Sequence, residues 1–329
     1  PPPNFHHYTI LPKRPETFSF PVVLAAMADL VELNSSFALA EKITFSEGQG
    51  GPLVKLKHPD LGEAVVSVYG GHVLRYKPTG QDEDVLFVSE QAIYRSGTAI
   101  RGGIPVCWPW FGPCPSDSSK PSHGIARTRM FEVRSTSEDP SGTLVVEVGL
   151  CASDETRAVW DHEFDLIIRV ELGTTLKTTL KTTNKGATPF SITTGLHTYF
   201  TISEIESISV TGLDGASYID KVDSMSEKQQ SGSITFTEEV DRIYNSDAAC
   251  EIHDEGLNRI ITIAKSGSQS TVVWNPWIDK SAGMTDLGNE DYHKFVCVET
   301  TNCGNDIVQI DAGETAEVYT DISCRPLLA

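Results

Sequence analysis

The stretch Glu163-Phe-Asp-Leu-Ile-Ile-Arg-Val-Glu-Leu172 alternates between apolar and polar side chains with a period of two. In an extended chain its apolar residues would all share one face, and the charged residues between them would share the other. Such alternation is typical of an antiparallel strand with one buried face and one solvated face. We therefore predict a half-buried strand of an antiparallel sheet here.

Similar short runs, rich in β-branched residues and separated by Gly, Pro and Asp, follow one another along the chain. The predicted strands cover residues 54–57, 64–69, 130–134, 144–151, 208–211, 233–236, 259–265, 270–274, 294–298 and 314–322. Helical periodicity is scarce, and we expect one short helix over Ser89–Arg95. The sequence thus predicts an all-β sandwich of antiparallel sheets with few short helices.

The organisation of the chain is simple after residue 30. Its 329 residues contain no fixed-period repeat and no low-complexity linker, so we predict a single sandwich domain over residues 31–329. We interpret residues 1–30 as a leader or a disordered extension. The segment opens with three prolines, and Met27-Ala28-Asp29 looks like a natural start.

The charge balance excludes several classes of partner. The 45 acidic residues outnumber the 26 Lys and Arg residues, which gives a net charge of −19. Nucleic acids and anionic membrane surfaces attract basic proteins, so neither is an expected partner. No apolar run reaches the roughly 18 residues that a membrane-spanning helix needs. The 7 cysteines are irregularly spaced without a C-x-x-C pair, which favours free thiols in a reducing, cytoplasmic compartment over a metal site.

The segment Arg101-Gly-Gly-Ile-Pro-Val-Cys-Trp-Pro-Trp-Phe-Gly112 is unusual for a strand. Its paired glycines allow a close approach of the backbone to another group. Arg101, beside those glycines, is well placed to reach a ligand. The aromatic residues of this segment are more simply explained as a rigid plug in the core.

A second group of basic residues lies in Ser122-His-Gly-Ile-Ala-Arg-Thr-Arg129. Arg127 and Arg129 would share one face if a strand begins there, and together with Arg101 they form a candidate anion site. The planar fork of arginine suits phosphate. Surface ion pairing with the abundant carboxylates explains the same arginines equally well.

An imidazole and a carboxylate come from two further segments, Ile192–Phe200 and Val296–Glu299. A lone histidine in a strand is more often structural than catalytic. His197 and Glu299 together, however, have ordinary pKa values of about 6.5 and 4.3, which suit a proton-transferring pair without metal or cofactor. We expect mutual attraction to keep both ionised and to raise the pKa of His197. Nucleotide-binding, zinc-protease and serine-hydrolase motifs are absent from the sequence.

Five segments in the same order resemble the glucose-6-phosphate 1-epimerases, or hexose-6-phosphate mutarotases, of the aldose 1-epimerase superfamily. The segments are Arg-Gly-Gly-Ile-Pro, His-Gly-Ile-Ala-Arg, Leu-His-Thr-Tyr-Phe, Val-Val-Trp-Asn-Pro-Trp-Ile-Asp-Lys-Ser and Val-Cys-Val-Glu. The resemblance runs from about Leu33 to Cys324. It implies a galactose-mutarotase-like β-supersandwich that interconverts the α and β anomers of glucose 6-phosphate and needs no cofactor and no metal.

The resemblance also implies roles for single residues. His197 and Glu299 match the catalytic residues of the family. The positions that match its substrate-binding residues are Arg101, Arg127, Asp241 and, in the pocket wall, His123. Relatives commonly carry Gln before His-Gly, where this chain has Ser122. A hydroxyl reaches less far, so that contact would be lost or mediated by water, and the preferred hexose phosphate stays open.

Three other functions fit parts of the sequence. A neutral-sugar aldose 1-epimerase would not need the arginines, and a noncatalytic carbohydrate-binding sandwich would not need the His–Glu pair. A glycoside hydrolase would need two carboxylates flanking the scissile bond. We expect a monomer that acts on a small phosphorylated hexose, although the sequence does not determine the oligomeric state.

Overall fold

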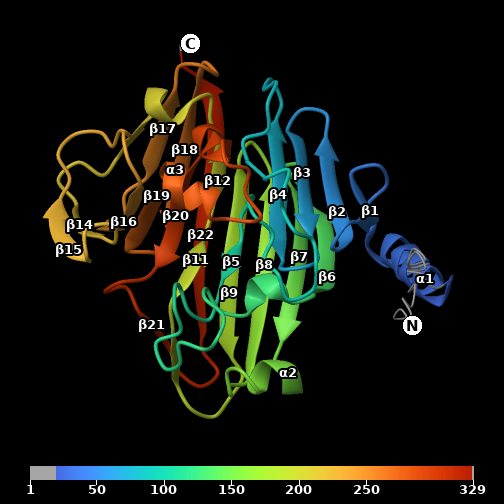
Figure 1. Cartoon of the computed structure of the whole chain (residues 1–329). Helices are drawn as coiled ribbons and strands as arrows, with labels where there is room; N and C mark the ends of the chain where they lie inside the picture. The colour runs from blue at the N-terminus through green and yellow to red at the C-terminus, as the bar shows by residue number, and fades with distance from the viewer. Residues whose placement is uncertain (1–19, 328–329) are drawn as a thin grey trace, which may run out of the picture.

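The computed structural model describes the backbone of residues 20–327 and the side chains of residues 29–327. These residues form antiparallel sheets joined by loops and a few helices (Figure 1). The all-β prediction is therefore confirmed. Residues 1–19, most of the expected leader, lie outside the described part of the chain.

One eight-stranded sheet, called here the scaffold sheet, has the order β13-β17-β18-β22-β9-β8-β7-β6. Its strands are β13 (Ser209–Thr211), β17 (Cys250–Asp254), β18 (Arg259–Ser266), β22 (Thr315–Pro326), β9 (Leu176–Asn184), β8 (Phe164–Leu172), β7 (Leu144–Cys151) and β6 (Glu132–Glu138). Along β8, buried and half-buried residues alternate without a break. The strand predicted from this alternation is confirmed, because its apolar face lies in the core.

A second eight-stranded sheet, called here the site sheet, has the order β15-β14-β16-β19-β20-β11-β5, and β12 also pairs with β20. Its strands are β15 (Ser226–Gln229), β14 (Ser217–Asp220), β16 (Val240–Asn245), β19 (Ser270–Asn275), β20 (Phe295–Asn302), β11 (Thr194–Leu196), β5 (Val106–Cys107) and β12 (Tyr199–Thr201). In β19 and β20 every residue is buried, which fits strands covered on both faces.

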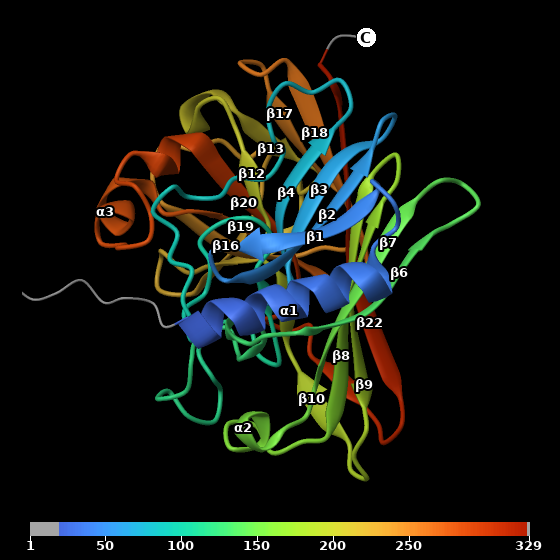
Figure 2. The same cartoon turned by 90° about the vertical axis from the view of Figure 1, so that its right-hand side faces the viewer.

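Smaller elements complete the fold. A four-stranded sheet contains β1 (Ile43–Gly48), β2 (Gly51–His58), β3 (Gly62–Ser67) and β4 (His72–Pro78), and β10 (Phe190–Ile192) pairs with β21 (Val308–Ile310). The helices are α1 (Phe20–Phe37), α2 (Asp154–Arg157) and α3 (Trp277–Ala282), with 3-10 turns η1 (Ala126–Thr128), η2 (Ile205–Ser207) and η3 (Asp291–Lys294). Helix α1 crosses the boundary that we placed at residue 30 and lies beside β1 (Figure 2).

Asn34 attaches α1 to the four-stranded sheet through two hydrogen bonds. Its side-chain amide donates to the backbone oxygen of Phe45 at 3.0 Å, and its side-chain oxygen accepts from the backbone N–H of Phe45 at 3.0 Å. Leu33 and Phe37 of the helix pack against the core. The C-terminal half of α1 is therefore part of the folded domain.

Three local predictions were wrong. Residues 89–95 contain a single turn at residues 90–91 and are otherwise irregular, and residues 233–236 contribute only an isolated bridge from Ile234 to Val210. The stretch Ile192–Phe200 is divided among β10, β11 and β12 instead of forming one strand. It is interrupted because the backbone N–H groups of Thr193 and His197 donate to Pro109 and Pro105, respectively.

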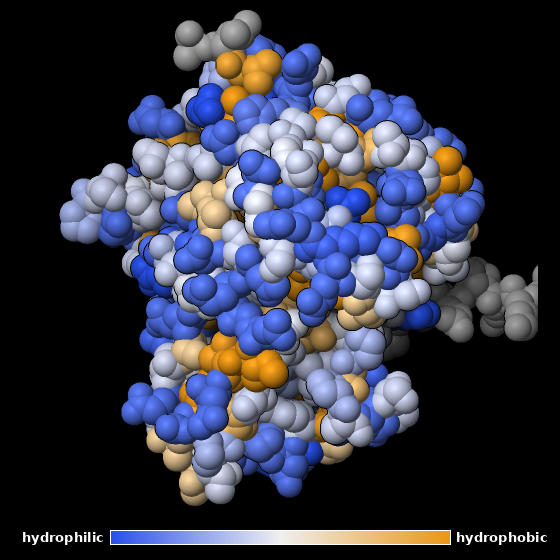
Figure 3. All heavy atoms as spheres, turned by 90° about the vertical axis from the view of Figure 1, so that its left-hand side faces the viewer, coloured by the Kyte–Doolittle hydropathy of each residue, from blue (hydrophilic) through white to orange (hydrophobic). Residues whose placement is uncertain are grey.

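The core extends through all the sheets, and its main cluster runs from Ile43 to Ile322. The surface is mostly hydrophilic, with hydrophobic residues in small groups on the face seen in Figure 3. Large hydrophobic side chains that are exposed within residues 29–327 are Val31, Met130, Val222, Met225, Ile278 and Ile307. Among the described helices, none combines the length and apolar character required for crossing a bilayer.

Candidate active site

Four neighbouring strands of the site sheet place side chains in one row. Asp241 of β16 is in register with Trp274 of β19, and Trp274 is in register with Cys297 of β20. On the other side of β20, Cys297 pairs with Tyr199 of β12. Glu299 lies two residues beyond Cys297, so both project from the same face of β20. The sheet thereby gathers residues from four separate segments of the sequence.

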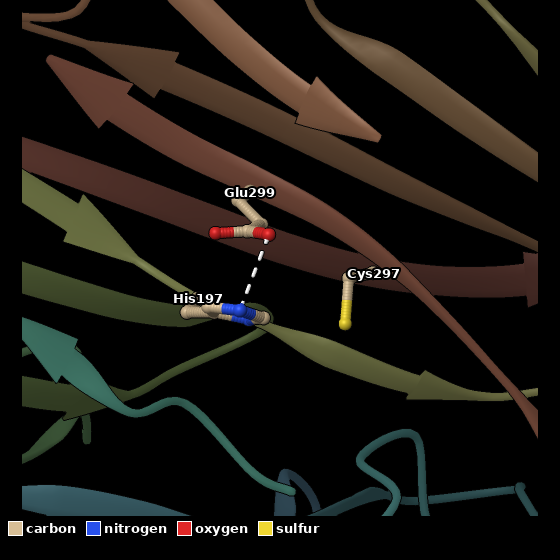
Figure 4. Close-up of side chains that lie close together, drawn as sticks. All are labelled: His197, Cys297 and Glu299. Carbon is tan, nitrogen blue, oxygen red and sulfur yellow. Dashed lines mark ion pairs between the residues drawn. The ribbon is translucent and has the colours of Figure 1, made fainter. Parts of the chain in front are cut away.

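His197 lies between β11 and β12, where its side chain meets Glu299 (Figure 4). The distance from its Nε2 to Oε1 of Glu299 is 3.4 Å. Glu299 is 1% exposed, whereas His197 is 8% exposed, so the imidazole is the part of the pair that solvent reaches. The two residues that the sequence placed on distant segments are thus brought together.

Aromatic rings hold the imidazole in place. Tyr199 stacks on it with a centroid distance of 5.0 Å and an interplanar angle of 12°. Trp274 and His123 approach it at tilted or edge-on angles, each with a centroid distance of 5.7 Å. His123 therefore lies beside His197.

The protonation preference of the pair differs from our expectation. Burial lowers the pKa of His197 well below its ordinary value, and the charges of His123, Arg127 and Arg101 lower it further. Burial likewise raises the pKa of Glu299 well above its ordinary value, and Asp241 adds to this effect. The expected rise in the pKa of His197 was wrong, because desolvation of both charges exceeds their mutual attraction.

Arg101 is positioned by the two glycines that follow it. A side chain on Gly102 would overlap the backbone of Phe87, and one on Gly103 would overlap the carbonyl oxygen of Val73. The sequence predicted that the backbone at these glycines approaches another group closely. That group is the chain's own backbone. Arg101 donates to Tyr199 Oη at 2.9 Å and to Asp286 Oδ2 at 3.0 Å.

Arg127 and Arg129 point to different surroundings, because residues 126–128 form η1 instead of a strand. Arg127 donates to the backbone oxygen of Ser122 at 2.9 Å, and none of the described carboxylates forms an ion pair with it. Its charge also depresses the pKa of His197. Arg129 instead forms an ion pair with Glu155 at 2.8 Å, so the surface ion-pair interpretation holds for Arg129.

Asp241 has two lysine partners that the sequence analysis missed. Lys221 reaches it at 2.8 Å, and Lys280 at 3.8 Å. Lys221 follows β14 directly and faces Asp241 because β14 pairs with β16. Only the strand pairing could have identified it, since no local motif marks this lysine.

Three cationic side chains influence the pKa of His123. Burial lowers the pKa of His123 to about 3, with further lowering by the charges of Arg127, Lys221 and Arg101. His123 is therefore neutral at physiological pH. Its edge-on contact with Phe111, at a centroid distance of 4.9 Å, orients the ring.

The structural interpretation of the remaining aromatic residues is confirmed for most of them. Trp108 is fully buried and donates to Thr182 Oγ1 at 2.9 Å. At the corner after β19, Asn275 donates to the backbone oxygens of Tyr292 and Phe295. Trp274 lies next to this corner and is also one of the aromatic residues that contact His197.

Ligand atoms of His197, Cys297 and Glu299 lie within 4.8 Å of one another and include the donor types that bind transition metals. A surface hollow of about 440 Å³ lies next to Asn258 and is not lined by these three residues.

Comparisons with known proteins show the family to which the chain belongs. The family model for aldose 1-epimerase matches residues 52–323. A protein from Escherichia coli K12, provisionally named a glucose-6-phosphate 1-epimerase, is 38% identical over 75% of this chain and 82% of its own length. A protein from Cenchrus ciliaris with the same provisional name is 33% identical over 72% of this chain and 74% of its own length.

Solved structures give the same result. A crystal structure from Salmonella typhimurium, provisionally named a mutarotase, has a TM-score of 0.81 and 32% identity, covering 88% of this chain and 96% of that chain. A galactose mutarotase related enzyme from Lactobacillus acidophilus has a TM-score of 0.65 at 13% identity and covers 87% of this chain and 98% of that chain, which supports the galactose-mutarotase-like fold. The chain belongs to the aldose 1-epimerase family, and it is an isomerase.

Proposed function

We propose that this protein is a hexose-6-phosphate mutarotase that interconverts the α and β anomers of glucose 6-phosphate. The observation that carries the proposal is the His197–Glu299 pair, separated by 3.4 Å and influenced by the charges of Arg101 and Arg127. The provisional names of the relatives from Escherichia coli and Cenchrus ciliaris support the same substrate.

The proposed reaction opens and closes a hemiacetal ring. Glu299 would remove the proton from the anomeric hydroxyl while His197 would donate a proton to the ring oxygen. The open aldehyde would rotate about its C1–C2 bond and close from the other face with the two roles exchanged. Both residues return to their starting states, so the cycle needs no cofactor.

Burial favours the neutral form of both groups, with the proton on Glu299 instead of on His197. The neutral pair contains as many protons as the ionised pair, so one transfer between the two side chains interconverts them. A bound phosphate dianion would offset the charges of Arg101 and Arg127, which depress the pKa of His197. Substrate binding would therefore favour the imidazolium that donates to the ring oxygen.

Arg127 is the proposed main phosphate contact, because its guanidinium uses one bond to a backbone oxygen and has no described carboxylate partner. Arg101 would assist Arg127, although the guanidinium of Arg101 already uses one of its nitrogen atoms to bind Asp286. Asp241 and His123 would contact the sugar. Ser122 offers its hydroxyl at the position where relatives commonly have Gln.

A neutral-sugar aldose 1-epimerase is the second candidate. The observation that favours it is the ion pairing of Arg101 with Asp286 and of Lys221 with Asp241, since both pairs reduce the positive charge available to a phosphate. The two candidates differ in whether the 6-phosphate contributes to catalysis.

Anomerisation rates separate these candidates. We expect kcat/KM, followed by optical rotation, to be at least about 100-fold higher for α-glucose 6-phosphate than for α-glucose. Arg127→Gln should remove most of this preference, whereas the matched change Arg129→Gln should leave it intact because Arg129 pairs with Glu155. Equal rates on both sugars would exclude the phosphate-specific function.

We also propose that the protein acts as a monomer in the cytoplasm. All seven cysteines are free thiols, which fits a reducing compartment. Size-exclusion chromatography with light scattering would test the oligomeric state, and a mass of twice 35.9 kDa would contradict the monomer.

A further inference from the structure

Cys297 has no role in the proposed sugar chemistry, yet its thiol lies close to the proposed catalytic pair (Figure 4). Its side chain, a ring nitrogen of His197 and a carboxylate oxygen of Glu299 all lie within 4.8 Å of one another. Thiolate, imidazole and carboxylate are the three protein ligand types of zinc sites with an open fourth position. A thiol at this position is therefore more than a small core residue.

One of the distances between donor atoms matches the corresponding distance in a zinc site closely. For bonds of about 2.0–2.1 Å, the nitrogen and oxygen ligands of a tetrahedral zinc ion are about 3.3 Å apart. The distance from His197 Nε2 to Glu299 Oε1 is 3.4 Å. In such a site the sulfur and nitrogen ligands are about 3.6 Å apart. Because the donor atoms here lie within 4.8 Å of one another, the thiol needs to move by only about 1 Å.

A further observation indicates that the donors are available. Oε2 of Glu299 is buried without a hydrogen-bond partner, and so is Nδ1 of His197. Buried polar atoms are normally satisfied, so the unpartnered Oε2, which belongs to the same carboxylate as the proposed ligand atom Oε1, favours an additional ligand there. Nδ1 lies on the other side of the ring from Nε2 and would not bind the same ion. The buried aromatic residues around the pair restrict movement of the imidazole.

We propose that His197, Cys297 and Glu299 form an inhibitory binding site for Zn²⁺ within the catalytic centre. The ion would bind the imidazole nitrogen, the carboxylate and the thiolate, and water or a sugar hydroxyl would fill the fourth position. Binding breaks the S–H bond of Cys297 and releases its proton, and that of Glu299, to solvent without a change of oxidation state. The occupied donors could no longer transfer protons to the sugar.

The binding test uses the full, untagged chain and Co²⁺ as a spectroscopic substitute for Zn²⁺. We expect a thiolate-to-cobalt charge-transfer band in the wild type, displaced by Zn²⁺ at one ion per chain. Cys297→Ala should weaken binding by more than about 100-fold, because even loss of an outer partner costs 10–100-fold in metal affinity. Cys107→Ala removes another buried thiol of the same sheet, and Cys151→Ser removes the exposed thiol; both should bind like the wild type.

Absence of the band from the wild type would overturn the proposal, as would its persistence in Cys297→Ala or its loss in Cys151→Ser. If Cys297→Ala does not fold, Cys297→Ser keeps the volume while removing the thiolate, and the same outcomes apply. The inhibitory part rests on the proposed function: Zn²⁺ should lower kcat for glucose 6-phosphate, because the occupied donors cannot transfer protons, and EDTA should reverse this. The cobalt band needs no turnover, so a missing band with intact anomerisation refutes only the zinc site. A band without anomerisation refutes only the proposed function.

Discussion

At the scale of single residues, Glu299 combines a proposed catalytic role with nearly complete burial. Glu299→Gln should reduce anomerisation of glucose 6-phosphate by about 10²–10⁴-fold, because the amide cannot accept the anomeric proton. Polarimetry measures this loss. A noncatalytic sandwich would instead bind sugar equally well before and after the change and show no turnover in either form.

The same substitution should stabilise the fold at neutral pH. The folded-state pKa of Glu299 is raised, so its protonated form stabilises the protein fully below about pH 4.5, and this contribution is lost as the pH rises through the folded-state value. The neutral amide of the variant cannot ionise and avoids the loss. Melting temperatures measured from pH 4.5 to 8 should show an advantage of Glu299→Gln that grows with pH. A constant difference would contradict the raised pKa.

Lys221 is expected to position Asp241 and to favour the ionised form of Glu299. Its charge lowers the pKa of Glu299, so Lys221→Met should shift the acid limb of the kcat/KM profile to higher pH. Lys228→Met is the matched control, because Lys228 lies on the same hairpin but pairs with Asp220 and Asp223. A profile that changes in height and not in its midpoint would indicate a purely structural role for Lys221.

At the scale of elements, the two glycines after Arg101 determine the path of the backbone and thereby the direction of the Arg101 side chain. Gly102 has a φ of 111°, and a Cβ atom there would overlap the backbone of Phe87. Gly102→Ala should cost about 1–3 kcal/mol through strain and should raise the KM for glucose 6-phosphate as Arg101 moves. Chemical denaturation and steady-state kinetics measure the two effects.

Gly97→Ala provides the control for this change. Gly97 also has a positive φ, of 78°, but an added Cβ would meet nothing within 4 Å. It should therefore cause the conformational strain without overlap and leave the KM unchanged. If both variants raise the KM equally, the position of Arg101 does not depend on the close approach at Gly102.

The sequence predicts elements well where local periodicity determines them. Leu144–Cys151 was predicted with its observed bounds, because its run of apolar residues reflects direct contact with the core. The breaks within Ile192–Phe200 could not be predicted, since they depend on hydrogen bonds to Pro105 and Pro109 from a distant part of the chain. Lys221 was missed for the same reason, because strand pairing alone brings it to Asp241.

At the scale of the whole molecule, long-range packing determines both the distance between the proposed site residues and their pKa values. The resemblance of five ordered segments identified His197 and Glu299, and the site sheet brings them together. The pKa directions could not be predicted, because they depend on how deeply the completed fold buries each group. Composition likewise could not show that three cationic side chains influence the pKa of His123 in a protein with a net charge of −19.

The continuity of the core predicts how the protein unfolds. Side chains from the scaffold sheet, the site sheet and the four-stranded sheet belong to one buried cluster, so none of the sheets can separate without exposing the apolar face of another. We expect one cooperative transition in urea, with coincident midpoints from far-UV circular dichroism and tryptophan fluorescence. Trp108 reports on contacts with the scaffold sheet, whereas Trp274 reports on the site sheet. Two separate midpoints would show that the sheets unfold independently and would contradict the single domain proposed for residues 31–329.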